Sequence, residues 1–126
     1  MKQVLLIDDN PVQLSIREAV LRDAGLQVSA ATTAESALAT LRSLQDSIGV
    51  VVTDHVMPGT SGLDVVREIR GISRALPIIV LSGLVEAEPE YDDLDVIFRA
   101  KPFPPQELIA LVRSSLQQGE SGPSAA

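Results

Sequence analysis

Five short apolar runs alternate with segments of helical periodicity, and this alternation limits the chain to a small set of α/β architectures. The runs are rich in leucine and β-branched residues and lie near residues 3–7, 27–31, 49–53, 77–81 and 95–98. Uninterrupted apolar runs of this length are typical of strands buried on both faces. Because crossovers between parallel strands are right-handed, the pattern predicts a doubly wound, five-stranded parallel sheet with helices on both faces.

Local signals mark the start and the end of the first predicted helix. Asn10 is a favourable N-cap, and Pro11 suits the first helical position. Gly25 is typical of the residue that follows a helix C-terminus. The apolar residues expected to share one face of this helix are Val12, Ile16, Ala19 and Val20.

Three further helices are predicted, and one segment between the last two strands lacks a regular helical pattern. The predicted helix starts are a capping box of Thr32 and Glu35, the N-cap Ser61, and Pro104-Pro105. Residues 86–95, where another helix is due, contain six carboxylates and Pro89 but no lysine or arginine. Like charges at helical spacing and an interior proline both oppose a helix. The fourth helix is therefore predicted to be short or irregular.

Composition narrows the classes of function. A length of 126 residues fits one domain, and the absence of cysteine excludes thiolate metal sites and cysteine nucleophiles. The net charge of −7 argues against direct binding to nucleic acid or to an anionic membrane. Because the sequence has neither a basic leader nor an apolar stretch long enough to cross a bilayer, we expect a cytoplasmic protein.

Polar side chains follow four of the predicted strands, and their chemistry matches one task. Asp8 and Asp9 follow the first strand, Asp54 the third, Ser82 the fourth and Lys101 the fifth. Parallel strands bring such positions to one carboxyl edge, where open α/β sheets place their ligands. Three carboxylates, a hydroxyl and an ammonium suit one divalent cation and one phosphoryl group.

Together these residues resemble the receiver domain of two-component response regulators. The matching motifs are Asp8-Asp9, Asp54 with Met57-Pro58-Gly59 and Gly62 after it, Ser82-Gly83, and Lys101-Pro102-Phe103. The resemblance runs from about residue 3 to residue 117. It implies the flavodoxin-like strand order 2-1-3-4-5 and a receiver domain over residues 1–118. The small and polar residues at 119–126 predict a flexible C-terminal tail.

The family resemblance also implies a role for each motif. A sensor histidine kinase or a phosphotransfer protein is expected to donate a phosphoryl group to Asp54. Ser82 is the hydroxyl expected to sense that group, Lys101 is its cationic contact, and Phe98 is the aromatic switch. The family's habit further suggests a cis peptide bond between Lys101 and Pro102.

Magnesium is the expected cofactor. Mg²⁺ favours octahedral oxygen ligation and usually takes one or two carboxylates while keeping several waters. Asp8, Asp9 and Asp54 can supply these oxygens, together with the backbone carbonyl of Val56. The metal on one side and Lys101 on the other would offset the charge of the transferring group.

Phe98, Val56 and Leu84 depart from the usual family pattern. Phe98 has no hydroxyl, so its switching must rest on hydrophobic burial. Val56 and Leu84, two residues past Asp54 and Ser82, are apolar and could hinder an attacking water, which predicts slow autodephosphorylation. The lone His55 is expected to be exposed and of minor importance.

Two other classes compete with a phosphorylation-controlled regulator that acts on an unknown downstream protein. A Mg²⁺-dependent phosphohydrolase would want a second aspartate two residues past the nucleophile, where Val56 stands after Asp54 and Asn10 after Asp8. A receiver used only for docking would not need the intact acidic pair, acceptor and Lys101. We therefore expect a regulator that is not an enzyme, most simply a stand-alone receiver, with a hybrid kinase or multidomain regulator as the alternative origin.

Overall fold

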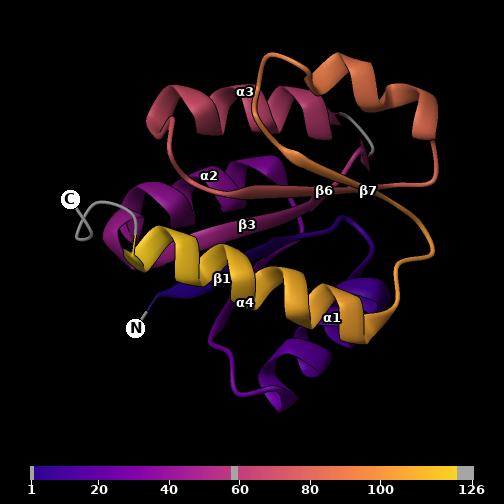
Figure 1. The fold of residues 1–126 in the computed structure, drawn as a ribbon. Coiled ribbons are helices and arrows are strands. Elements are labelled where there is room, and N and C mark those ends of the chain that lie inside the picture. The colour runs from indigo at the N-terminus through magenta and orange to yellow at the C-terminus, as the bar shows by residue number, and fades with distance from the viewer. Residues whose placement is uncertain (1, 58–59, 122–126) are drawn as a thin grey trace.

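The predicted doubly wound sheet is present in the computed structural model, which describes residues 2–57 and 60–121 (Figure 1). Five parallel strands are ordered β2-β1-β3-β6-β7, which confirms the order expected for a flavodoxin-like sheet. Their bounds are β1 Gln3–Ile7, β2 Val28–Ala31, β3 Ile48–Asp54, β6 Ile78–Ser82 and β7 Ile97–Ala100. A small antiparallel pair, β4 (Val56–Met57) and β5 (Thr60–Ser61), follows the third strand and was not predicted.

Two layers of helices cover the sheet, as Figure 1 shows. The helices are α1 Pro11–Asp23, α2 Ala34–Ser43, α3 Gly62–Ile72 and α4 Pro105–Ser121. Alternate residues of each strand point to opposite faces, so Leu5 packs on the α2–α3 side while Leu6 packs on the α1–α4 side. Every residue of β3 is buried, as expected for the central strand of a sheet covered on both faces.

The first helix begins and ends as predicted but turns a different face toward the sheet. The Asn10 side chain accepts hydrogen bonds from the first-turn amides, and Gly25 has a φ of 89° after the helix. Leu14 and Leu21 are the buried residues of α1. Val12 and Ile16, from the apolar face predicted for this helix, are 69% and 59% exposed, so this face does not pack in the core.

The other helix ends agree with the sequence to within a few residues. The α2 cap is Thr33, whose hydroxyl accepts from the Ser36 amide, so the predicted capping box at Thr32 was wrong by one position. Ser61 caps α3 as predicted, through a bond from the Asp64 amide. Helix α4 extends through Ser121, into the segment expected to be a flexible tail, and residues 122–126 lie outside the described part of the chain.

The acidic segment before the last strand is irregular, as predicted. Residues Val85–Tyr91 form the short 3₁₀ helix η2 in place of an α-helix. Arg70 of α3 ties the chain after η2 to the body of the domain. Its guanidinium donates to four backbone carbonyls, those of Ser73, Leu76, Leu94 and Asp95. One half-buried side chain therefore joins the loop before β6 to the loop before β7.

Candidate phosphoacceptor site

Three carboxylates meet where the sheet reverses its strand order. Strand β1 pairs with β2 on one side and with β3 on the other, so the crossovers from β1 and β3 leave toward opposite faces. Asp8 and Asp9 follow β1, and Asp54 ends β3. One carboxylate oxygen from each of the three lies within 4.8 Å of the others. The predicted acidic cluster is therefore assembled at the carboxyl edge.

Asp8 is the most constrained of the three. Its carboxylate is 1% exposed and accepts from the Asn10 amide at 3.0 Å, which links it to the start of α1. Burial, together with the hydrogen bond and the charge of Asp54, raises the pKa of Asp8 from 3.8 to about 6, while the Asn10 amide acts in the opposite direction. The pocket therefore holds this charge at a cost.

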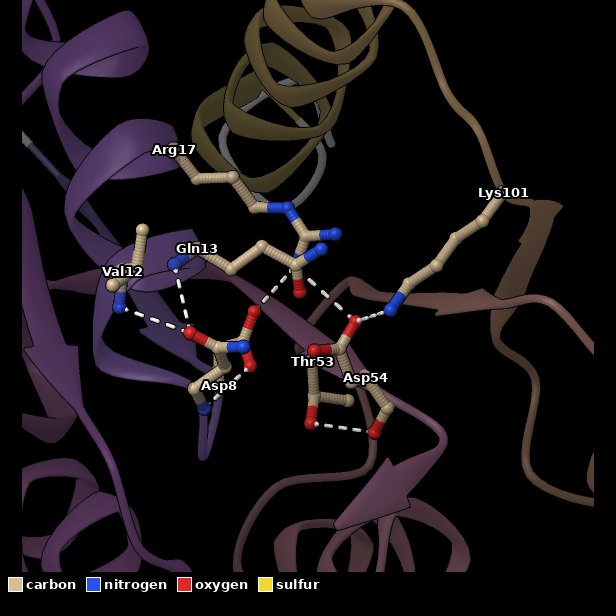
Figure 2. Close-up of polar contacts among 8 residues, drawn as sticks. Asp8, Val12, Gln13, Arg17, Thr53, Asp54 and Lys101 are labelled. Carbon is tan, nitrogen blue, oxygen red and sulfur yellow. Dashed lines mark hydrogen bonds and ion pairs between the residues drawn. The ribbon is translucent and has the colours of Figure 1, made fainter.

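Asp54 is buried at 2% exposure and receives the predicted cation. The Lys101 ammonium lies 2.8 Å from Asp54 Oδ1, as Figure 2 shows. Lys101 follows β7, two strands away from β3, so its long side chain crosses the end of β6 to reach the carboxylate. The Lys101–Pro102 peptide bond is cis, as the family resemblance suggested.

A second cation, Arg17, lies in the pocket and was not predicted from the sequence. Arg17 of α1 places one guanidinium nitrogen 2.9 Å from Asp8 Oδ2 and 3.2 Å from Asp54 Oδ1 (Figure 2). The Arg17 side chain is 15% exposed. A signal existed, because Arg17 follows the buried Leu14 by three residues and precedes the buried Leu21 by four, which places all three on one face of a helix.

Ser82 and Phe98 lie on the strands expected but do not contact the carboxylates among the described interactions. The Ser82 hydroxyl accepts from the Leu84 amide at 2.9 Å and is 2% exposed. Phe98 is 8% exposed and packs in the core beside Tyr91, with ring centroids 5.7 Å apart. The aromatic ring of Phe98 therefore points inward in this state.

His55 differs from its expected placement. The residue is only 9% exposed, and its Nδ1 pairs with the Tyr91 hydroxyl at 2.5 Å, so the prediction of an exposed histidine was wrong. Tyr91 comes from η2 and lies between His55 and Phe98, with ring contacts to both. The residue directly after Asp54 is thus joined to the segment that precedes β7.

Close packing beside Asp54 explains one glycine of the motif. A Cβ at Gly62 would overlap the backbone carbonyl of Asp54 and the Cα of His55, so only glycine allows α3 to start this close to the end of β3. A Cβ at Gly83 would meet nothing within 4 Å, which leaves open space beside Ser82. The motif residues Pro58 and Gly59 lie outside the described residues.

Comparisons with known proteins identify the family of the chain. The model of the response regulator receiver domain family matches residues 4–113. The DNA-binding response regulator MtrA of Mycolicibacterium smegmatis is 30% identical, over 98% of this chain and 54% of its own length. The putative two-component response regulator ARR21 of Arabidopsis thaliana is also 30% identical, over 96% of this chain and 20% of its own length. The chain thus spans about half, or less, of these relatives.

Solved structures show the same architecture. A response regulator receiver domain protein from Clostridium thermocellum superposes with a TM-score of 0.87 at 27% identity, covering 95% of this chain and 98% of that one. A response regulator receiver protein from Pseudomonas putida gives a TM-score of 0.79 at 34% identity, covering 90% and 96%. In the described part of the chain, no helix combines the length and apolar character needed to cross a membrane. The chain belongs to the family of response regulator receiver domains.

Proposed function

We propose that this receiver domain is a phosphorylation-controlled switch that accepts a phosphoryl group on Asp54 from the phosphohistidine of a sensor kinase or phosphotransfer protein. One observation carries the proposal: Asp54 is buried, yet its Oδ1 faces the Lys101 ammonium at 2.8 Å and lies among three clustered carboxylates. An aspartate that served only in a turn would not need an ammonium and two further carboxylates around it. We place the reaction in the cytoplasm.

The donor set fits Mg²⁺. Oxygens of Asp8, Asp9 and Asp54 within 4.8 Å of one another are hard ligands of the kind this ion prefers. We assign these carboxylates, with the backbone carbonyl of Val56, as the residues that would hold the ion. When bound, the ion would neutralise charge on the phosphoryl oxygens.

The protein's own groups perform the transfer. The Asp54 carboxylate acts as the nucleophile, so a phosphorus–oxygen bond forms to Asp54 as the phosphorus–nitrogen bond to the donor histidine breaks. Lys101 neutralises part of the negative charge that gathers around the acceptor oxygen. The open space at Gly83 leaves room for the phosphoryl group beside Ser82.

A change of state follows from the contacts of the switch residues. The Ser82 hydroxyl bonds to its own loop in this state, and we propose that it turns to the phosphoryl group on Asp54. Phe98 then responds through its packing against Tyr91, because the phenyl ring has no hydroxyl to hold it in place. The ligand shifts a pre-existing balance between two arrangements.

The surface suggests which partners the domain contacts directly. Val12 and Ile16 of α1 are exposed apolar residues beside the pocket, and we assign them to the docking surface for the phosphodonor. Although MtrA is named as DNA-binding, the chain spans only 54% of it, and its net charge of −7 opposes contact with nucleic acid by this domain. The output partner is therefore another protein or another part of a longer chain.

Incubation with acetyl phosphate and Mg²⁺ tests the proposal. We expect intact-mass analysis to show the gain of one phosphoryl group, mapped to Asp54 after borohydride trapping, and no gain with excess EDTA. The Asp54→Asn variant should not be modified. The matched control is Asp46→Asn, which changes an exposed aspartate at the opposite edge of the sheet and should be modified like the parent. Modification that persists in the Asp54→Asn variant, or no modification of the parent, would refute the assignment.

The rate of phosphoryl loss tests the role of the apolar neighbours. Leu84 is 45% exposed beside Ser82, where it can cover the approach of a hydrolytic water. We therefore propose slow autodephosphorylation and expect Leu84→Lys to shorten the half-life of the phosphorylated protein. A parent half-life of seconds would contradict this part of the proposal.

A further inference from the structure

Arg17 supplies to this pocket a charge that the proposed phosphotransfer does not use. A single guanidinium nitrogen bridges Asp8 Oδ2 at 2.9 Å and Asp54 Oδ1 at 3.2 Å. Among the interactions of the described residues, this is the one ion pair that Asp8 makes, whereas Asp54 also pairs with Lys101. Arg17 and Lys101 therefore approach the cluster from different elements and meet at Asp54 Oδ1, while Arg17 also reaches Asp8, as Figure 2 shows.

Arg17 contacts two of the three carboxylates that would hold a metal. A divalent ion held by Asp8 and Asp54 would need oxygens of the same carboxylates that now accept from Arg17. Charge also opposes joint occupancy. The two cations leave the three carboxylates with one negative charge in excess, and a divalent ion added beside both would reverse the sign before any phosphoryl group arrives.

The surroundings of Arg17 offer a place for the displaced side chain. Arg17 lies at the border between the acidic pocket and a groove of about 160 Å³ between α1 and α4. The groove is lined by Gln13, Ile16, Val20, Phe103 and Pro105. An arginine stem packs well along such apolar walls while its guanidinium reaches water. The side chain can thus leave the carboxylates without unfolding α1.

We propose that Arg17 is a positioning residue that takes the place of the cation in the metal-free pocket and competes with the divalent ion for the oxygens of Asp8 and Asp54. The inference rests on the proposed function, since it concerns the same pocket. Arg17 stabilises the domain while metal is absent and thereby sets the metal concentration at which the pocket becomes competent for phosphotransfer. Binding of the ion releases Arg17 toward the groove.

Calorimetric titration with MgCl₂ tests the competition without any phosphorylation. Removal of charge-assisted hydrogen bonds from the two carboxylates should tighten Mg²⁺ binding by about tenfold in Arg17→Gln. The matched control is Arg42→Gln, which removes an exposed cation from α2 on the other face of the sheet and should bind Mg²⁺ like the parent. Arg17→Gln should also melt at a lower temperature than the parent in EDTA.

Each outcome separates the two proposals. Equal or weaker Mg²⁺ binding by Arg17→Gln overturns the competition and leaves the proposed phosphoacceptor site intact. Failure of both parent and variant to bind Mg²⁺ overturns the metal site itself and the competition with it. A merely structural role would lower the melting temperature of Arg17→Gln without tightening the binding of Mg²⁺.

A measurement on the parent protein avoids any folding defect of the variant. The guanidinium N–H signals of Arg17 in a nitrogen-15 NMR spectrum should shift when Mg²⁺ saturates the site, since the carboxylate contacts are lost. Arg70 donates to four backbone carbonyls away from the pocket and serves as the internal reference, with signals that stay in place. An Arg17 signal that does not move at saturating Mg²⁺ would overturn the inference.

Discussion

Replacement of Asp8 by asparagine should stabilise the metal-free domain. Asp8 is 1% exposed, and burial together with the hydrogen bond and charge of Asp54 raises its pKa from 3.8 to about 6. Asparagine imitates the protonated carboxyl, because its oxygen can accept from the Asn10 amide and its amide can donate to Asp54. The variant therefore keeps the hydrogen bond from the Asn10 amide, gives up the bond from Arg17 to Asp8 Oδ2, and removes the charge that the pocket disfavours.

The raised pKa sets the size of the effect. The interval between 3.8 and about 6 corresponds to about 3 kcal/mol at about 1.4 kcal/mol per pH unit. Above pH 6 the Asp8 carboxyl is ionised in both the folded and the unfolded protein, so the parent bears the whole penalty. Below the unfolded pKa it is protonated in both states, and the penalty vanishes. The stability contributed by protonated Asp8 is thus lost as pH rises from about 4 to about 6.

Urea unfolding followed by circular dichroism in EDTA measures this difference. At pH 7.5 we expect Asp8→Asn to exceed the parent by about 2–3 kcal/mol in the free energy of unfolding, and the gap should close toward pH 4. Asp46→Asn, exposed at the opposite edge of the sheet, should show neither effect. A gain that persists at pH 4, or a loss of stability at pH 7.5, would refute the electrostatic reasoning.

Three further substitutions probe contacts outside the cluster. Arg70→Ala should lower the free energy of unfolding by about 2–4 kcal/mol, because four backbone carbonyls lose their donor; a loss below about 1 kcal/mol in urea would contradict this. Tyr91→Phe removes the hydroxyl that pairs with His55 and should cost about 1 kcal/mol. A free energy of unfolding equal to that of the parent would contradict this contact. Gly62→Ala places a Cβ against the Asp54 carbonyl, so it should destabilise the domain by about 2 kcal/mol or more. The same variant should react more slowly with acetyl phosphate. Stability and reaction rate equal to those of the parent would refute this prediction.

The sequence determined the architecture and most of the acidic edge. The apolar runs indicate where the strands lie, and the polar residues after four of these runs must reach the carboxyl edge of a parallel sheet. Asp8, Asp54 and Lys101 are therefore predictable from the sequence, and so is the irregular segment whose charges and Pro89 oppose a helix. These predictions depend on local periodicity and on the chirality of crossovers, which a linear sequence contains.

Tertiary packing decided which side chains complete the site. The apolar Val12 and Ile16 suggested one orientation of α1, but the groove between the sheet and α4 accepts Leu14 and Leu21, and this rotation carries Arg17 onto the carboxylates. The burial of His55 likewise depends on Tyr91, 36 residues further along the chain. Helical periodicity allows more than one inward face, and the energy that selects among them comes from partners distant in sequence, so the choice exists only in the folded molecule.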